Sequence, residues 1–264
     1  MQLKTDRMIA RKEGGIGWMI FNAPERRNAV SYEMWQAIPE ILADFAKDDA
    51  VRVVVMRGEG GKAFVSGADI SQFAEKRATA DAVETYNRAT AAAHEAMSSL
   101  DKPLIAMIQG FCIGGGVAVA LDADIRIASE DSQFGVPAAK LGLGYAYDGI
   151  KALMDLVGPS YAKEIFFTAK RFTAAEAQMM GLVNRVVPAD RLEEVVLDYA
   201  RTIAENAPLT IRAVKATVAE GLKNPEERDL ARIDRMVKAC FASQDYVEGR
   251  TAFMEKRKPM FQGR

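Results

Sequence analysis

The sequence predicts an α/β protein in which short apolar strands alternate with longer amphipathic helices. Apolar runs occur at residues 16–21, 51–56, 104–108 and 125–128, and Gly, Asn or Ser follows each of them within two residues. Segments of helical periodicity separate the first three runs. After about residue 148 the pattern is helical, which predicts a helical region appended to an α/β core.

The first strand, at residues 16–21, leads through a turn at Pro24 into a helix. Ser31 is a typical N-cap, because its hydroxyl can accept a hydrogen bond from a backbone N–H of the first helical turn. The sequence places Asp48 at the end of this helix. The apolar residues between these two ends recur at helical spacing: Met34, Trp35, Ile38, Ile41, Leu42 and Phe45.

The central part repeats the strand and helix pattern. Residues 51–56 are rich in Val, which favours a buried strand. Residues 82–100 have helical periodicity and end before Pro103. A buried strand at 104–108 then leads through three glycines into a helix at 117–121.

The C-terminal part is predicted to be helical, and we divide the chain into a core of residues 1–198 and an oligomerisation region of residues 199–264. One long final helix is expected from 225 to 254, with Leu230 and Phe241 on its apolar face. Asp148 is expected to cap the helix that follows it. The other helices are predicted at residues 150–157, 162–168, 174–180, 192–206 and 210–222.

Composition restricts the function classes. The chain has 264 residues, of which 35 are basic and 36 acidic, so no net field attracts nucleic acid or an anionic membrane surface. No apolar run is long enough to span a membrane. Two cysteines outside any CxxC pair and a single histidine argue against a disulfide framework or a metal site. We therefore expect a cytoplasmic protein without a bound metal.

Two glycine-containing segments offer accessible backbone N–H groups. The strand at 104–108, the glycines at 114–116 and the helix after them form a site that suits a phosphate or a developing oxyanion. The alternative is close packing of strand on helix, because the segment matches neither the P-loop nor GxGxxG. The second segment is Ser66-Gly67-Ala68-Asp69, in which Asp69 is able to cap the next turn.

Several motifs in order resemble the crotonase superfamily, whose best-known member is enoyl-CoA hydratase. The resemblance extends from about residue 8 to residue 260. The segments that carry it are residues 24–29, Ala63-Phe64-Val65-Ser66-Gly67-Ala68-Asp69-Ile70, Gly110-Phe111-Cys112-Ile113-Gly114-Gly115-Gly116, Ala123-Asp124-Ile125-Arg126-Ile127-Ala128, Phe134-Gly135-Val136-Pro137 and Phe253-Met254-Glu255-Lys256-Arg257.

The resemblance implies a spiral of ββα units with a C-terminal helical trimerisation region, and trimers that pair into hexamers. It implies an acyl-CoA thioester substrate and no separate cofactor, because CoA is part of the substrate. The backbone N–H groups of Ala68 and Gly115 match the family's oxyanion hole. The implied substrate-binding residues are Arg26, Ser66, Ala68, Asp69, Ile70, Gly115, Phe253 and Lys256.

Two of these assignments have particular implications. Arg26 lies where the family often has a cation near the CoA phosphates. The alternative is that it belongs to a solvated charged turn without a role in binding. Phe253 and Lys256 match tail positions that touch CoA, in some cases across a subunit boundary.

The sequence departs from the hydratase pattern at both catalytic glutamates. Ala118 and Ala138 stand at those positions. Alanine neither activates water nor delivers a proton, and such groups contribute about 10²–10⁴-fold each. Tyr145 is the first candidate to replace them, because a phenol can steer a carboxylate or protonate an enolate; the alternative is that it only lines the acyl site. His94 lies in an Ala-rich helix, far along the chain from the motif loops, and is not expected to act in catalysis.

Three functions therefore stay open at this point. The overall resemblance favours an enoyl-CoA hydratase-like lyase. The missing carboxylates favour a decarboxylase or isomerase, because loss of CO₂ itself generates the enolate without an acid or base. A tyrosine like Tyr145 also occurs in a decarboxylase branch, but that branch has histidine at the position of Ala68. A non-catalytic acyl-CoA-binding protein is the third possibility.

Overall fold

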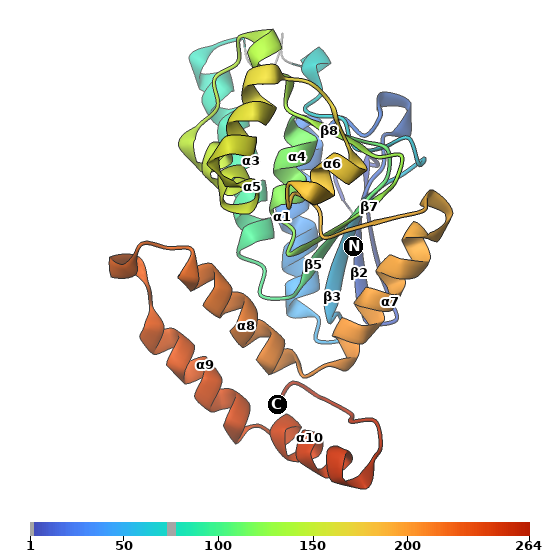
Figure 1. Ribbon diagram of the computed structural model, residues 1–264, viewed down its shortest axis with the longest axis vertical. Helices are drawn as coiled ribbons and strands as arrows, with labels where there is room; N and C mark the ends of the chain where they lie inside the picture. Colours follow the sequence, from blue (N-terminus) through green and yellow to red (C-terminus); the bar gives the residue numbers. More distant parts are fainter. Residues whose placement is uncertain (1–2, 73–77) are drawn as a thin grey trace.

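The computed structural model describes residues 3–72 and 78–264, which form two β-sheets covered by helices (Figure 1). The larger sheet has the strand order β1-β2-β3-β5-β7-β10 and the smaller sheet the order β4-β6-β8-β9. The strands are β1 (Met8–Glu13), β2 (Ile16–Phe21), β3 (Val53–Gly58), β4 (Ala63–Val65), β5 (Leu104–Ile108), β6 (Phe111–Ile113), β7 (Ile125–Ser129), β8 (Gln133–Gly135), β9 (Phe172–Thr173) and β10 (Arg185–Val187).

Parallel pairing dominates both sheets. In the large sheet β1 pairs antiparallel with β2, from Met8 opposite Phe21 to Glu13 opposite Ile16, and the other pairs are parallel. In the small sheet β4, β6 and β8 are parallel, and β9 closes it antiparallel. Parallel pairs need crossover connections, which the intervening helices supply.

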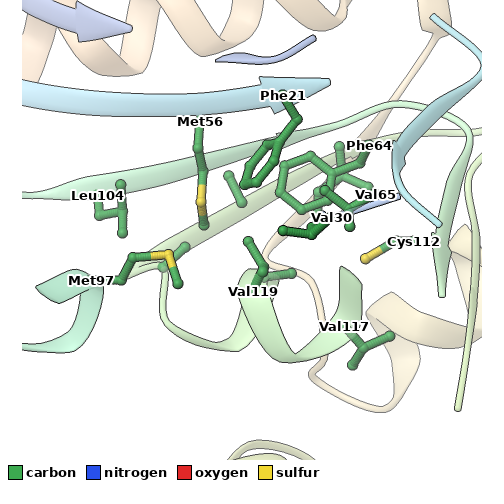
Figure 2. Close-up of a cluster of buried hydrophobic side chains, with 14 of the residues drawn as sticks. Phe21, Val30, Met56, Phe64, Val65, Met97, Leu104, Cys112, Val117 and Val119 are labelled. Atoms are coloured by element: carbon green, nitrogen blue, oxygen red, sulfur yellow. The ribbon is translucent and has the colours of Figure 1, made fainter. Parts of the chain in front are cut away.

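Helices cover both faces of the large sheet, so the core has two layers (Figure 1). Alternation along β2 shows this directly, because Met19 and Phe21 pack with α1 while Trp18 and Ile20 pack with α7. Figure 2 shows the α1 side, where Phe21, Phe64 and Val119 lie in one buried cluster. The helices are α1 (Tyr32–Lys47), α3 (Ala80–Ser98), α4 (Gly115–Leu121), α5 (Tyr147–Thr168), α6 (Ala174–Met179), α7 (Leu192–Glu205), α8 (Pro208–Gly221), α9 (Leu230–Ala242) and α10 (Gln244–Glu255).

Most of the predicted helices and strands are confirmed. Ser31 caps α1, with its hydroxyl accepting from Met34 N–H at 3.4 Å. The prediction of Asp148 as an N-cap is wrong, because α5 begins at Tyr147 and its extended cap residue is Ala146. The two helices expected at 150–168 form the single element α5, with a break at Gly158 where φ is +74°.

The single long C-terminal helix is also a wrong prediction. The chain leaves the helix at Ser243, where φ is −77° and ψ is 155°, and continues as α10. The Ser243 hydroxyl accepts from Tyr246 N–H at 3.1 Å, so it caps the new helix. Serine competes with helical hydrogen bonding through its hydroxyl, and it therefore favours a boundary here.

Helices α8, α9 and α10 form an arm that projects from the core (Figure 1). An apolar groove of about 1250 Å³ lies on the arm, and its lining includes Val218, Val237, Phe241 and Phe253. These four side chains are exposed in the single chain. Among the described residues, no helix is both long and apolar enough to cross a membrane.

Candidate active site

Two backbone loops meet beside β4 and β6. The first follows β4 and is held by a parallel bridge between Val30 and Ala68. The second follows β6 and is held by Gly114 N–H, which donates to Gly135 O at 2.8 Å. A Cβ atom placed on Gly115 would lie only 3.4 Å from Ala68 N. The structure thus brings together the two residues that the sequence singled out.

Glycine is required at two positions of the second loop. Gly114 has φ of +56° and ψ of −114°, a conformation that side chains disfavour. A Cβ on Gly116 would lie 2.0 Å from Val65 O, so α4 packs directly on the end of β4. Close strand–helix packing, the alternative stated for this motif, is therefore present, and it is what holds Gly115 beside Ala68.

The backbone N–H groups of Ala68 and Gly115 have no protein acceptor in the part of the chain that the structure describes. Gly115 is the first residue of α4, where helical N–H groups are unpaired by geometry. Both residues are half-buried, so a ligand is able to reach them. We call these two donors the cradle. Such a pair suits a carbonyl oxygen that gains negative charge.

A polar cluster fixes the loop on the far side of Ala68. Arg26 donates to the Asp69 carboxylate at 2.9 Å and to the Ser71 hydroxyl at 2.8 Å. Asp69 also accepts from Ser71 N–H at 3.1 Å, so it caps that turn as expected. Burial would raise the pKa of Asp69, but hydrogen bonds from Ser71 and the charge of Arg26 hold it below its ordinary value.

The remaining residues of this loop differ in exposure. Ser66 N–H donates to Arg27 O at 3.1 Å, which ties the loop to the turn that carries Arg26. Ile70 is exposed next to buried Asp69. Arg26 is held in place by Asp69, and the sequence alone gave no indication of this ion pair.

Ala118 and Ala138, which the resemblance places at the positions of the two glutamates, lie on the elements that flank the cradle. Ala118 is half-buried on α4, one turn beyond Gly115. Ala138 is buried in the short 3-10 helix Pro137–Leu141. A Cβ on Gly114 would lie 3.8 Å from the Pro137 ring, so this helix begins beside the cradle. Neither methyl group supplies a proton.

Tyr145 lies in the segment that connects this 3-10 helix to α5. Its ring packs edge-on against Phe166, with 5.0 Å between ring centroids and an interplanar angle of 71°. Burial raises the pKa of the phenol, so it is protonated at neutral pH. The packing fixes the ring, and the hydroxyl has no protein partner among the described residues.

Phe253 and Lys256 do not lie with the other candidates in the single chain. Both are on the arm, at the end of α10, away from α4 (Figure 1). Phe253 is 83% exposed and lines the apolar groove. The structure of the single chain does not bring these two residues together with the cradle.

The hydrogen bond between His94 and Asp122, near α4, was not predicted from the sequence. His94 Nδ1 on α3 lies 2.5 Å from Asp122 Oδ2 at the C-terminal end of α4. The two residues are 28 positions apart, so no local pattern connects them. The sequence did indicate that Asp122 lies one helical turn after Ala118, but it did not indicate that His94 is its partner.

The fold and the cradle define a class of α/β proteins with paired backbone donors, and comparison with known proteins identifies the family. The family model described as enoyl-CoA hydratase/isomerase matches residues 11–264. The chain therefore belongs to the enoyl-CoA hydratase/isomerase family, within the crotonase superfamily. The α/β fold and the C-terminal helices match crotonase-like structures.

Several relatives are similar over nearly the whole chain. A short-chain-enoyl-CoA hydratase of Clostridium acetobutylicum is 32% identical, with 97% of each chain covered. A crotonyl-CoA hydratase of Syntrophomonas wolfei is 34% identical, covering 97% of this chain and 98% of the other. The solved structure of an enoyl-CoA hydratase/carnithine racemase from Magnetospirillum magneticum has a TM-score of 0.94 at 35% identity, covering 99% of this chain and 97% of that one.

Proposed function

We propose that the protein binds an acyl-CoA thioester and stabilises its enolate with the backbone N–H groups of Ala68 and Gly115. The observation that carries this proposal is the cradle: two adjacent backbone donors that have no acceptor among the residues that the structure describes. Backbone donors do not depend on side chains, so the substitutions at Ala118 and Ala138 leave them intact. No cofactor other than the CoA of the substrate is required.

We propose an enoyl-CoA hydratase-like lyase as the activity, in line with the names of the relatives. A second candidate, decarboxylation of a β-carboxylated acyl-CoA, is favoured by Ala118 and Ala138, because loss of CO₂ generates the enolate without an added base. Isomerisation of an acyl-CoA belongs to the same enolate chemistry. All three reactions use the cradle in the same way.

The test is incubation of the purified protein with crotonyl-CoA and, separately, with methylmalonyl-CoA, followed by absorbance and mass. Addition of 18 Da to crotonyl-CoA supports hydration, and loss of 44 Da from methylmalonyl-CoA supports decarboxylation; both masses follow from the reaction chemistry. Turnover of neither compound, with CoA binding retained, would identify a non-catalytic binder.

We propose that Tyr145 steers the substrate or donates a proton to the enolate, and Tyr145→Phe tests this. Removing the hydroxyl is expected to lower turnover by about 10²-fold while the ring packing on Phe166 is retained. Tyr147→Phe is the matched control, because Tyr147 is 73% exposed two residues away. Full activity in Tyr145→Phe would remove this residue from the mechanism.

We propose that the arm assembles the chain into a homotrimer or a hexamer, and that Phe253 and Lys256 then contact CoA of a neighbouring subunit. The apolar groove on the arm supports this. Val218→Asp places a charge in the groove and is expected to lower the mass measured by sedimentation equilibrium. Met179→Asp, an exposed position on α6, is the control. An unchanged mass for Val218→Asp would contradict assembly through this groove.

We also place the protein in a reducing compartment, the cytoplasm. Cys112 and Cys240 are both unpaired, and burial raises the pKa of the Cys112 thiol. Free thiols are typical of cytoplasmic proteins.

A further inference from the structure

The proposed enolate chemistry needs a group that moves a proton. By the resemblance, glutamates supply this group in the family, and this chain has Ala118 and Ala138 at their positions. Asp122 lies one turn after Ala118 and shares its side of α4. The four-residue step corresponds to about 6 Å along a helix axis. The first titratable side chain on this side of α4 is therefore Asp122, and it is bound to the only histidine of the chain.

His94 and Asp122 form a close and partly enclosed pair. Asp122 Oδ2 lies 2.5 Å from His94 Nδ1, and the side chains are 16% and 30% exposed. Burial raises the pKa of Asp122, and the hydrogen bond with His94 only partly offsets this effect. The charged form of the Asp122 carboxylate is therefore stabilised by His94. The contact also fixes the orientation of the imidazole, with Nδ1 facing Asp122.

Aromatic packing fixes the imidazole from the other side. The Trp35 ring lies 5.5 Å from the His94 ring, centroid to centroid. Trp35 is buried on α1, and its indole N–H donates to the Tyr86 hydroxyl at 3.1 Å. The ring is thus held between α1 and α4. No protein atom among the described residues is hydrogen-bonded to Nε2, and the 30% exposure leaves the ring accessible.

We propose that His94 is the proton-transfer residue of this active site and that Asp122 is its positioning residue. This inference rests on the proposed acyl-CoA function. A carboxylate at Nδ1 selects the tautomer in which Nε2 carries the lone pair, which is the arrangement a general base requires.

The step is a reversible proton transfer. The proton on the substrate α-carbon moves to His94 Nε2, and the C–H electron pair forms the enolate C=C bond. The thioester carbonyl electrons move to its oxygen, which the cradle stabilises. Return of a proton from Nε2 to the α-carbon restores the thioester, so no further reactant is needed.

Exchange of the α-protons of butyryl-CoA in D₂O, followed by mass spectrometry, tests this step without assuming a net reaction. His94→Gln is expected to slow the exchange by at least about 10²-fold, with butyryl-CoA binding retained. Added imidazole is expected to restore part of the rate to His94→Ala, which the loss of a merely structural contact would not allow. Asp122→Asn, which leaves His94 in place, is expected to slow the exchange without weakening binding.

Glu95→Gln is the matched control, because Glu95 is the exposed neighbour of His94 on α3. Exchange at the wild-type rate in folded His94→Gln would overturn the role of His94, and so would binding of butyryl-CoA by the wild type without any exchange. Absence of binding by the wild type would instead refute the proposed function. If His94→Gln does not fold, Asp122→Asn and the imidazole rescue of His94→Ala decide the question.

Discussion

Replacement of Gly115 by proline is expected to slow α-proton exchange in butyryl-CoA by about 10²–10³-fold. Proline has no backbone N–H, so this variant removes one of the two cradle donors. Gly115 is the first residue of α4, a position at which helices accept proline. The rate is measured in D₂O by mass spectrometry, with the affinity for butyryl-CoA measured in parallel by calorimetry.

Gly115→Ala is the matched control for this variant. It retains the N–H group and adds a Cβ atom 3.4 Å from Ala68 N, which is tight but within what a loop accommodates. The proline variant should therefore be much slower than the alanine variant. Equal rates in the two variants would show that the Gly115 N–H does not stabilise the enolate.

The second large effect is expected on stability, from Gly116→Ala. The new Cβ would lie 2.0 Å from Val65 O and 2.8 Å from Val65 C, so α4 must move away from β4. Overpacking of this kind lowers the free energy of unfolding by about 1–3 kcal/mol, and by more where backbone blocks the relief. Urea denaturation followed by circular dichroism measures the change.

Gly221→Ala controls for the loss of glycine flexibility. Gly221 is the last residue of α8, and a Cβ there has no heavy atom within 4 Å. Alanine is favoured over glycine in a helix by about 0.5–1 kcal/mol, so this variant should be as stable as the wild type or more stable. A Gly116→Ala protein as stable as Gly221→Ala would contradict the close packing of α4 on β4.

Local signals made much of the fold predictable. The apolar spacing and the Ser31 cap defined α1, and the predicted strand at 104–108 coincides with β5. These elements carry their information within a few residues, as caps, turns and periodicity. The order of the motifs then identified the superfamily.

Elements that depend on distant partners were not predictable. β1 was missed because its outer residues are charged, as befits an edge strand that pairs only with β2. Strands β4, β6 and β8 have three residues each and are defined by pairing with one another. The start of α10 has a local signal in the Ser243 cap, but it is also held by distant contacts, because the Asp245 carboxylate accepts from Gln262 N–H at 2.6 Å and from Gly263 N–H at 2.7 Å.

The candidate site was predictable only in part, because its side-chain pairs join residues that are far apart in the sequence. Two glycine-containing loops were identified from the sequence, the resemblance to the family singled out Ala68 and Gly115 within them, and the structure places these two residues side by side. The bond between Arg26 and Asp69 spans 43 positions and the one between His94 and Asp122 spans 28, so both are products of tertiary packing.

The central claim is that the cradle binds and polarises a thioester carbonyl, and isotope-edited infrared spectroscopy tests it most directly. Butyryl-CoA labelled with ¹³C at the carbonyl is bound to the wild type, and the difference from unlabelled ligand isolates the C=O stretch. Two N–H donors on the oxygen weaken the C=O bond, so the band is predicted to move to lower frequency on binding, and to move back in Gly115→Pro. A C=O band that stays at its frequency in water when the ligand binds the wild type would contradict the account. So would a band that is shifted equally in the wild type and in Gly115→Pro.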